Sequence, residues 1–321
     1  MGTTRRPRFG SLAYYPRKRT KKPVASVRCW AKVKEAKLLG FAGYKVGMTH
    51  LMIIDNGPNS MTKGETIFCP ATIIECPPLK AASIRFYKKT VYGMKVVGDV
   101  LAENLDKELE RKITLPKNKK KKVEDIKDFD DVMLVIYTQP KLTSIGKKKP
   151  ELFEMAIGGK KEEKLNYANG VLGKEIKVGD IFKEGNQLDV HAITKGKGLQ
   201  GPVKRFGIGL KGHKSEKGRR NPGSLGPWCG QMNIMWKVPH AGQMGYFQRL
   251  DFNKLLLKIG ENTEEINPKG GFIKYGLIKN NYIIVKGSVA GPRKRLIRLN
   301  FAIRPSKKVT KEAPAIKQIV Q

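Results

Sequence analysis

The sequence has no long apolar run, and no stretch approaches the roughly 18 consecutive apolar residues that a membrane-spanning helix needs. Its first ten residues, MGTTRRPRFG, contain no apolar core of a signal peptide. Arg6 stands where N-myristoylation requires Ser or Thr. We therefore expect no membrane span, no signal peptide and no myristoyl anchor.

Cysteine is scarce, and none of the cysteines forms a CxxC pair of the kind found in zinc sites and disulfide frameworks. The histidines are not spaced with Cys, Asp or Glu as a metal cluster would be. We therefore expect reduced thiols, no metal site and no cofactor. The residues concerned are Cys29, Cys69, Cys76, Cys229, His50, His191, His213 and His240.

Signatures of catalysis are also missing, since the sequence contains no GxSxG, Walker A or HExxH motif. Gly196–Gly201 matches GxGxxG literally, but Pro202 and a Gly-rich basic loop follow where a dinucleotide site requires a helix. His191 lies in a strand-like run and is interpreted as a half-buried side chain and not a base. We expect no catalytic residue.

Positive charge is what the sequence has in excess, with 64 Lys+Arg against 28 Asp+Glu and a net charge of +36. Such an excess would repel itself in a compact monomer, so it implies a polyanionic partner. Phosphate is the natural candidate, because bound Lys and Arg displace condensed counterions. Hydrophobic residues make up 40% of the chain, which is enough for a buried core in one or two domains.

The charge is unevenly distributed along the chain. Residues 99–189 contain 18 acidic and 19 basic residues, a net of +1, whereas the remainder contains 10 acidic and 45 basic residues, a net of +35. One internal segment is therefore nearly neutral. We interpret it as a solvent-facing insert within a protein that otherwise faces RNA.

Three stretches concentrate the positive charge. An N-terminal arm precedes the first acid, Glu35, and interleaves aromatic rings with cations, which suits base stacking together with phosphate contact. It cannot bury a core, so we expect it to be disordered alone. The second stretch, 195–249, is rich in Gly and Pro and has one acid, Glu216; the third, between Glu265 and Glu312, has none.

From these stretches we predict a set of RNA-binding residues, with an idle loop side chain as the alternative for the two histidines. The set is Arg5, Arg6, Arg8, Tyr14, Tyr15, Arg17, Lys18, Arg19, Lys21, Lys22, Lys195, Lys197, Lys204, Arg205, Lys211, His213, Lys214, Lys217, Arg219, Arg220, Lys237, His240, Arg249, Lys286, Arg293, Lys294, Arg295 and Arg298.

Short strand-like runs separated by Gly and Pro predict a mainly β protein with a small closed barrel. The alternation in 295–303 predicts a half-buried strand with one charged face. Residues 246–261 are interpreted as a helix or as a strand followed by a helix, and the tail from Ser306 as frayed. The other predicted strands are 51–55, 68–76, 188–194 and 282–289, and the predicted turns are 177–180 and 280–282.

The near-neutral segment is predicted to be a small α/β lobe. Leu101, Leu105 and Leu109 have helical spacing, which predicts a helix over 101–113. Residues 131–139 form a continuous apolar run, typical of a strand covered on both faces. The lysine run 117–122 is interpreted as a solvated loop.

Four motifs, in order along the chain, carry a family resemblance. They are GFAGYKVGMTH (Gly40–His50), GSLGPW (Gly223–Trp228), PHAGQMGY (Pro239–Tyr246) and NYIIVKGSVAGP (Asn281–Pro292). Together they resemble the universal large-subunit ribosomal protein L-three family in its archaeal and eukaryotic form. The resemblance covers most of the chain, and the extra lobe of that form fits residues 84–173.

The resemblance implies a translation-factor-like β-barrel built from discontinuous segments, with a long arm and a central finger threaded into ribosomal RNA. Trp228 matches the aromatic residue at the finger tip, where it would stack on a base or else pack on Pro227 or a neighbouring protein. Trp236 is interpreted as a stem-packing residue. The family's GQMG element maps to Gly242–Gly245, which adds Gln243 to the RNA-binding set together with Trp228.

The chain departs from the family pattern after the finger tip, where Cys229-Gly230 stand in place of His-Pro. Glu216 lies at about the place of a histidine that is modified in some members. The predicted division of the chain is arm 1–36, barrel 37–83, α/β insert 84–173, barrel 174–203, finger 204–242, barrel 243–305 and C-terminal tail 306–321.

The function that the resemblance implies is that of a structural constituent of the large ribosomal subunit. The chain would bind and organise ribosomal RNA, with the finger tip approaching the peptidyl transferase centre. It would contact neighbouring ribosomal proteins, be present once per cytoplasmic ribosome, and take no small-molecule substrate. Two other hypotheses stay open: an enzyme that acts on RNA, such as a modifying factor, and a non-ribosomal basic chaperone that binds RNA transiently.

Overall fold

A computed structural model describes residues 9–116, 122–126, 128–226, 232–310 and 312–320. The predicted RNA-binding residues Arg5, Arg6, Arg8 and Trp228 lie outside the described residues. The chain divides into two compact units. Unit 1 comprises Met1–Pro23 and Ile193–Gln248, and unit 2 comprises Val24–Ala192 and Arg249–Gln321.

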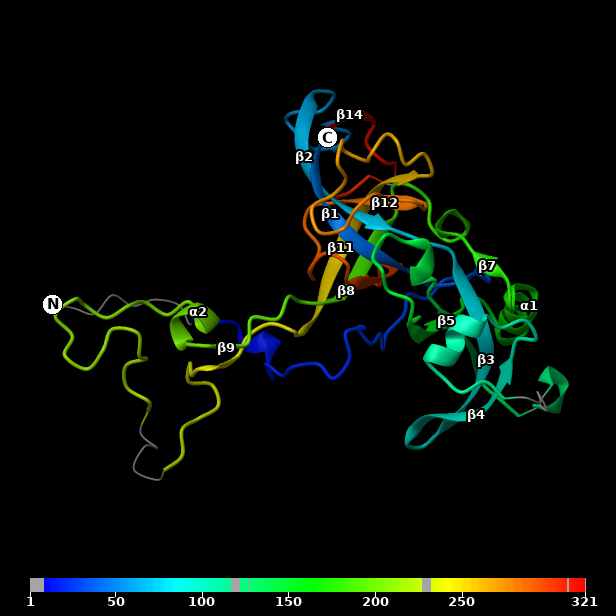
Figure 1. The fold of residues 1–321 in the computed structure, drawn as a ribbon, viewed down its shortest axis with the longest axis horizontal. Coiled ribbons are helices and arrows are strands. Elements are labelled where there is room, and N and C mark those ends of the chain that lie inside the picture. The colour runs from blue at the N-terminus through cyan, green and yellow to red at the C-terminus, as the bar shows by residue number, and fades with distance from the viewer. Residues whose placement is uncertain (1–8, 117–121, 127, 227–231, 311, 321) are drawn as a thin grey trace. The chain divides into compact units, whose positions relative to one another are not determined.

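The larger sheet has seven strands in the order β13-β8-β11-β12-β2-β1-β14, and β13 also pairs with β1 over Gly40–Tyr44 (Figure 1). Neighbouring strands of this sheet that are joined by a ladder of hydrogen bonds run antiparallel, as β1 and β2 do. The strands are β1 (Gly40–Ile54), β2 (Thr66–Glu75), β8 (Gln187–Ile193), β11 (Gln248–Gly260), β12 (Tyr282–Lys286), β13 (Leu296–Phe301) and β14 (Ile316–Val320).

The prediction of a mainly β protein is confirmed, and each of the five predicted strands of the basic parts falls within or overlaps an observed strand. The prediction of a small closed barrel is not confirmed, because the strands form large antiparallel sheets. The tail after Ser306 is not simply frayed, since β14 pairs with β1 and extends the sheet at its edge.

Two further predictions about strands are wrong. Residues 248–260 form the single strand β11 and no helix, because this apolar segment finds hydrogen-bonding partners in β8 and β12. Strand β13 has no charged solvent face: Leu296 to Asn300 are all buried, since both faces of the strand are covered. Tertiary packing therefore overrides the helix expected within 246–261 and the apolar–basic alternation of 295–303.

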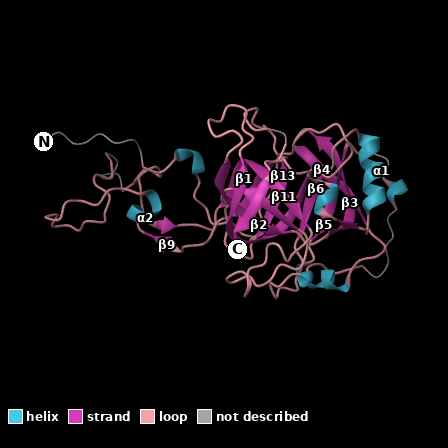
Figure 2. Ribbon diagram, turned by 90° about the horizontal axis from the view of Figure 1, so that it is seen from above, coloured by secondary structure: helices cyan, strands magenta, loops and turns pink. Residues whose placement is uncertain are grey.

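The smaller sheet has the order β4-β3-β5-β6, with β7 paired to β3. The predicted strand at 131–139 is confirmed as β5, with four consecutive buried residues. Helix α1 (Lys161–Val171) packs on β5 and β3 (Figure 2). The strands are β3 (Leu79–Thr90), β4 (Gly93–Leu101), β5 (Asp131–Tyr137), β6 (Leu152–Ala156) and β7 (Glu175–Ile176).

The predicted helix over 101–113 is largely wrong. Leu101 ends strand β4 opposite Ser83, so cross-strand pairing has replaced the helical turn that the leucine spacing suggested. Only a 3-10 turn, η2 (Lys107–Arg111), forms, and it buries Leu109 against Ala82. Other 3-10 turns are η1 (Leu12–Tyr14), η3 (Val123–Asp125), η4 (Pro140–Leu142) and η5 (Val178–Asp180).

One apolar cluster in unit 2 includes residues of both sheets, among them Phe41 of β1 and Phe86 of β3. Glu75 of β2 is fully buried, and a buried carboxylate is costly unless it is hydrogen-bonded. It accepts bonds from the Tyr275 hydroxyl, from the backbone N–H of Lys279 at 3.0 Å, and from the backbone and side chain of Asn280 at 3.1 and 2.8 Å. These bonds fix the 275–280 segment to β2.

Candidate RNA-binding surface

Unit 1 concentrates the positive charge of the chain. Its 79 residues contain 18 Lys+Arg and one acid, Glu216, a net of +17. Unit 2 has a net of +19 spread over 242 residues. Nearly half of the net charge therefore lies in a quarter of the chain, which is the distribution expected of a polyanion-binding element.

The base of the predicted finger is a two-stranded stem. Strands β9 (Leu199–Gln200) and β10 (Gly242–Gln243) pair antiparallel, and bonds from Lys197 N to Met244 O and from Thr194 N to Phe247 O, both 2.9 Å, continue the pairing. Gly245 has φ +74°, and a Cβ there would lie 2.0 Å from the Lys195 carbonyl oxygen. Glycine is therefore required for the close approach of the two chains at this point.

Arg205 links the two chain segments of the stem through its side chain. It lies in the short helix α2 (Pro202–Phe206), and its guanidinium donates to the carbonyls of Gln243 at 3.1 Å and His240 at 3.0 Å. Partial burial, and then the nearby charge of Arg17, lower the pKa of Arg205. Arg205, predicted as an RNA-binding residue, is thus also a brace of the finger's base.

A helix does follow the GxGxxG match, with Pro202 in its first turn, but it has only five residues, and Lys204 and Arg205 lie in its last turn. Pro is tolerated there because the first helical N–H has no partner within the helix. The sequence-based rejection of a dinucleotide site did not anticipate this helix. Among the strands that the structure describes, β9 pairs only with the antiparallel β10, so no βαβ unit is formed by the described residues around it.

The N-terminal arm packs along the finger's base within unit 1. Arg17 donates to the Arg205 carbonyl at 3.1 Å, and its guanidinium lies 4.3 Å from the centre of the Phe206 ring. Thr20 donates from its backbone and its hydroxyl to the Tyr246 carbonyl, at 3.0 and 3.1 Å. These contacts give the described part of the arm a defined path. The sequence-based expectation that the arm is disordered alone did not anticipate them.

Aromatic residues also connect the arm to the finger. The rings of Tyr15 and Trp236 meet edge to face with centroids 4.8 Å apart. Trp236 is nevertheless 67% exposed, so its interpretation as a stem-packing residue is supported only by this one contact. Tyr14 is also exposed. Of the two predicted stacking tyrosines, therefore, Tyr14 is the more exposed, and Tyr15 is partly used within unit 1.

Most predicted cations of unit 1 end in solvent. Lys211, Gln243 and His240 are half-buried, and His213 is exposed. The exposed cations are Lys18, Arg19, Lys21, Lys22, Lys195, Lys197, Lys204, Lys214, Lys217, Arg219, Arg220 and Lys237.

Unit 2 presents a smaller cationic loop. Buried Lys45, whose pKa burial lowers, donates from Nζ to the carbonyls of Val289 and, at 3.2 Å, Gly291. The Asp251 carboxylate accepts from the backbone N–H of Ala290 at 3.1 Å. The 289–294 loop is thereby held in place with Arg293 and Lys294 exposed at its end. Of the other predicted residues, Lys286 is exposed, and Arg249 and Arg295 are half-buried.

Arg298 does not belong to the surface. It is 4% exposed, and it donates to the carbonyls of Ala25 at 3.2 Å and Glu154 at 2.6 Å. Its guanidinium lies 5.7 Å from the Trp30 ring and 4.7 Å from the Phe153 ring. Burial lowers its pKa to about 10. Its prediction as an RNA-binding residue is corrected: it fastens residues 25–30 to the sheet.

Several residues that shape the surface carry no signal in the sequence. Thr20, Phe206 and Asp251 are common residue types outside any recognisable motif, Lys45 lies in the Gly40–His50 motif without standing out from it, and each acts on a partner at least 39 positions away. Phe206 could have been noted as a lone aromatic residue in a Gly-rich basic stretch. The remaining three become visible only in the folded chain.

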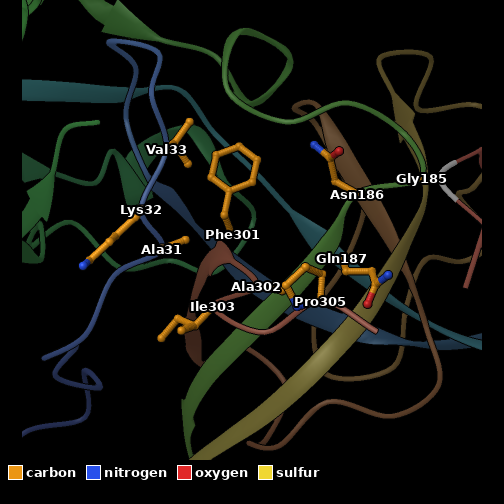
Figure 3. Close-up of a pocket in the computed structure, with 10 residues that line it drawn as sticks. All are labelled: Ala31, Lys32, Val33, Gly185, Asn186, Gln187, Phe301, Ala302, Ile303 and Pro305. Atoms are coloured by element: carbon orange, nitrogen blue, oxygen red, sulfur yellow. The ribbon is translucent and has the colours of Figure 1, made fainter. Parts of the chain in front are cut away.

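One hollow of unit 2, of about 420 Å³, does not resemble a catalytic cleft. It is lined by uncharged residues around Phe301, with Lys32 as its one ionisable residue (Figure 3). His191 is buried; burial, and then the charge of Arg298, lower its pKa to about 4, which makes it a poor base. Within the described ranges, no group of three or more His, Cys, Asp or Glu is placed to hold a metal ion.

The thiols and the helices add two observations. Cys29, Cys69 and Cys76 are free thiols, and Cys229 lies outside the described residues. Among the described helices, none has the length and apolar character needed to cross a membrane.

Comparison with known proteins gives a match over nearly the whole chain. The family model described as Ribosomal protein L3 matches residues 1–320. Large ribosomal subunit protein uL3 of Archaeoglobus fulgidus is 52% identical over 311 residues, which cover 94% of this chain and 93% of the relative. The protein of the same name from Methanocaldococcus jannaschii is 50% identical, with 95% and 94% covered. The one from Methanobrevibacter smithii is 49% identical, with 98% and 96% covered.

Proposed function

This chain belongs to the ribosomal protein L3 family, and we propose that it is a structural constituent of the large ribosomal subunit. The family is structural and non-enzymatic, so the chain is not an enzyme. Its partners would be large-subunit ribosomal RNA and neighbouring ribosomal proteins, and its location the cytoplasmic ribosome. The archaeal relatives agree with the archaeal and eukaryotic form of the family.

Unit 1 is the proposed principal RNA-binding element, and the observation that carries this proposal is its net charge of +17 in 79 residues. Arg205 and Gly245 fix the stem, and Thr20 fixes the arm, so the exposed lysines and arginines are presented from a defined backbone. Cations held in this way bind phosphate with a smaller loss of conformational entropy. The arm and finger would thereby organise ribosomal RNA during assembly.

The finger tip is a finer part of the proposal. On the family resemblance, Trp228 would approach the peptidyl transferase centre, where stacking of its indole on a base would contribute about 1–3 kcal/mol. Subunits with Trp228→Ala should assemble but bind tRNA or translation factors abnormally. Normal translation by such subunits would refute this role.

The barrel and the division of the chain are also proposals. The pairing of β13 with β1 connects β1, β2, β12, β11, β8 and β13 in sequence, and we propose that these strands correspond to the family's translation-factor-like barrel. The smaller sheet, formed between Leu79 and Ile176, supports the assignment of residues 84–173 as an insert. The arm (1–36) and finger (204–242) would be the two extensions.

Cell extract fractionated on sucrose gradients at moderate and at high salt tests the proposed function. The chain should sediment with the large subunit in stoichiometric amount at both salt concentrations, because an arm and finger enclosed by folded RNA are held by stacking and packing as well as by the phosphate contacts that salt weakens. Release into the soluble pool at moderate salt would instead indicate a transient RNA chaperone. Turnover of free RNA by the purified chain would support the enzyme hypothesis.

A further inference from the structure

The hairpin formed by β3 and β4 reaches beyond the sheet to which it belongs (Figure 1). Strand β5 pairs with β3 only as far as Tyr87, whereas the β3–β4 ladder continues to Thr90 and Gly93. The projecting part, together with the adjoining residues Val96 and Val97 of β4, exposes five large apolar side chains, which we call the tip cluster. Their exposed fractions are Val91 99%, Tyr92 101%, Met94 47%, Val96 42% and Val97 45%.

The turn of this hairpin is built from unusual residues. Val91 and Tyr92 connect the paired residues Thr90 and Gly93, and the Thr90 hydroxyl donates to the Gly93 carbonyl at 2.8 Å. Turn positions favour Gly, Pro, Asn, Asp and Ser, whose backbones or side chains suit the reversal. A β-branched and an aromatic residue, both fully exposed, gain nothing from folding at this place. Local choices that oppose the fold in this way are typical of functional sites.

The base of the hairpin is firmly held. Arg85 of β3 binds its cross-strand partner Asp99 through two bonds of 2.8 and 2.7 Å, and it also pairs with Glu154 of β6. Lys88 pairs with Asp128, and the backbone N–H of Lys89 donates to the Asp130 carboxylate at 2.7 Å. The tip cluster is therefore presented on a braced ribbon, which lowers the entropic cost of docking it into a partner.

The charges around the tip favour a protein over RNA as the partner. The hairpin itself is basic, but Asp99 and Asp128 pair with its Arg85 and Lys88, and the adjoining segment 99–189 is nearly neutral, so phosphate is attracted there less than to unit 1. Lys89 and Lys95 flank the apolar side chains on the two strands. This arrangement matches the common anatomy of protein interfaces, an apolar centre with a charged rim.

We propose that the tip cluster inserts into an apolar groove of another large-subunit protein whose rim is acidic and faces Lys89 and Lys95. Tyr92 would be the central anchor, since a tyrosine offers a large rigid ring at a low cost in conformational entropy. The inference rests on the proposed function only in placing the partner within the large subunit.

The experiment uses subunits assembled in cells with a photo-crosslinking benzoylphenylalanine in place of Tyr92. After irradiation of purified large subunits, the adduct should resist ribonuclease and be degraded by protease. The crosslinked peptide should be apolar and flanked by Asp or Glu. An adduct that ribonuclease removes would overturn the inference in favour of RNA, and the absence of an adduct would overturn it as well. If the chain is absent from large subunits altogether, it is the proposed function that fails.

Binding between this chain and the crosslinked protein, both purified, supplies the second measurement. The pair Val91→Ser and Tyr92→Ser should weaken binding about 10-fold or more, as truncation of an interface anchor does. Lys89→Glu with Lys95→Glu should also weaken it, through repulsion from the acidic rim. Met61→Ser removes an equally exposed apolar side chain from another turn and should leave the affinity unchanged. Equal affinities for all these variants would overturn the inference.

Discussion

Arg205 donates to the backbone carbonyl of His240 at 3.0 Å, while a second nitrogen of the same guanidinium reaches the carbonyl of Gln243 at 3.1 Å. One side chain from the outgoing limb of the finger thus holds two points of the returning limb. An arginine that braces the backbone differs from its exposed neighbour Lys204, although both were predicted as phosphate contacts. The two residues therefore allow bracing and phosphate binding to be separated by experiment.

Arg205→Met should loosen the stem, because it retains the aliphatic part of the side chain and removes both donors. Hydrogen bonds from charged groups contribute about 1.5–3 kcal/mol each. Amide exchange at Gly242 and Gln243 should therefore accelerate about 10-fold or more. Lys204→Met is the matched control and should leave exchange unchanged. Unaltered exchange in Arg205→Met would show that the stem does not depend on this brace.

Gly245→Ala should disrupt the return of the finger more than any other glycine substitution in the stem. The new Cβ would lie 2.0 Å from the Lys195 carbonyl oxygen at a φ of +74°, so the backbone must move, and the left-handed conformation alone costs about 1–2 kcal/mol. Limited proteolysis at Lys195 and Lys197 should become faster. Gly212→Ala, where an added Cβ meets nothing within 4 Å, should behave as the unsubstituted chain. Equal cleavage of the two variants would contradict the close approach.

His191 should make stability depend on pH. Burial, and then the charge of its cross-strand partner Arg298, lower the pKa of His191 to about 4 in the folded chain, whereas an unfolded histidine has a pKa of about 6.5. Below pH 6.5 the unfolded state therefore binds a proton that the folded state does not. The folded state loses stability as the pH falls from about 6.5 towards 4, by about 2 kcal/mol between pH 7 and 5.

Urea unfolding at pH 7, 6 and 5 measures this effect in the full chain and in His191→Phe. The phenyl ring cannot take up a proton, so the variant should lose about 2 kcal/mol less than the unsubstituted chain between pH 7 and 5. The difference between the two proteins isolates His191, because the other titrating groups are common to both. Parallel pH profiles would mean that His191 is protonated equally in the folded and unfolded states.

The strands with strong β-branched or apolar runs could be predicted from the sequence, as β5 and β12 show. Their pattern is local, and the sheet only completes it. The segment with Leu101, Leu105 and Leu109 shows where such prediction fails. Its spacing suits a helix, but Leu101 pairs with Ser83 in the β3–β4 ladder. The deciding contact there lies 18 positions away and has no local signature.

The candidate surface divides in the same way. Charge density and Gly content marked the arm and finger, since neither depends on the fold. Arg298 could not be distinguished from Arg293 by sequence, because both lie in one basic run. Only the fold shows that Arg298 is enclosed by Trp30 and Phe153, while Arg293 remains exposed at the end of its loop. A count of basic residues therefore identifies the RNA-facing segments but not the individual contacts.

The salt dependence of RNA binding should distinguish the finger from the near-neutral segment. Lys214 and Lys217 are exposed in the finger, and Lys148 and Lys149 are also exposed in unit 2 within residues 99–189. Each lysine that neutralises a phosphate contributes about 0.7–0.9 to the slope of log K against log salt concentration. The double change Lys214→Gln and Lys217→Gln should therefore reduce the slope by about 1.4–1.8 with a large-subunit RNA transcript. Lys148→Gln with Lys149→Gln removes the same charge and should leave the slope unchanged. Equal reductions would mean that RNA responds to net charge alone, and the assignment of the finger as the RNA-binding element would then fail.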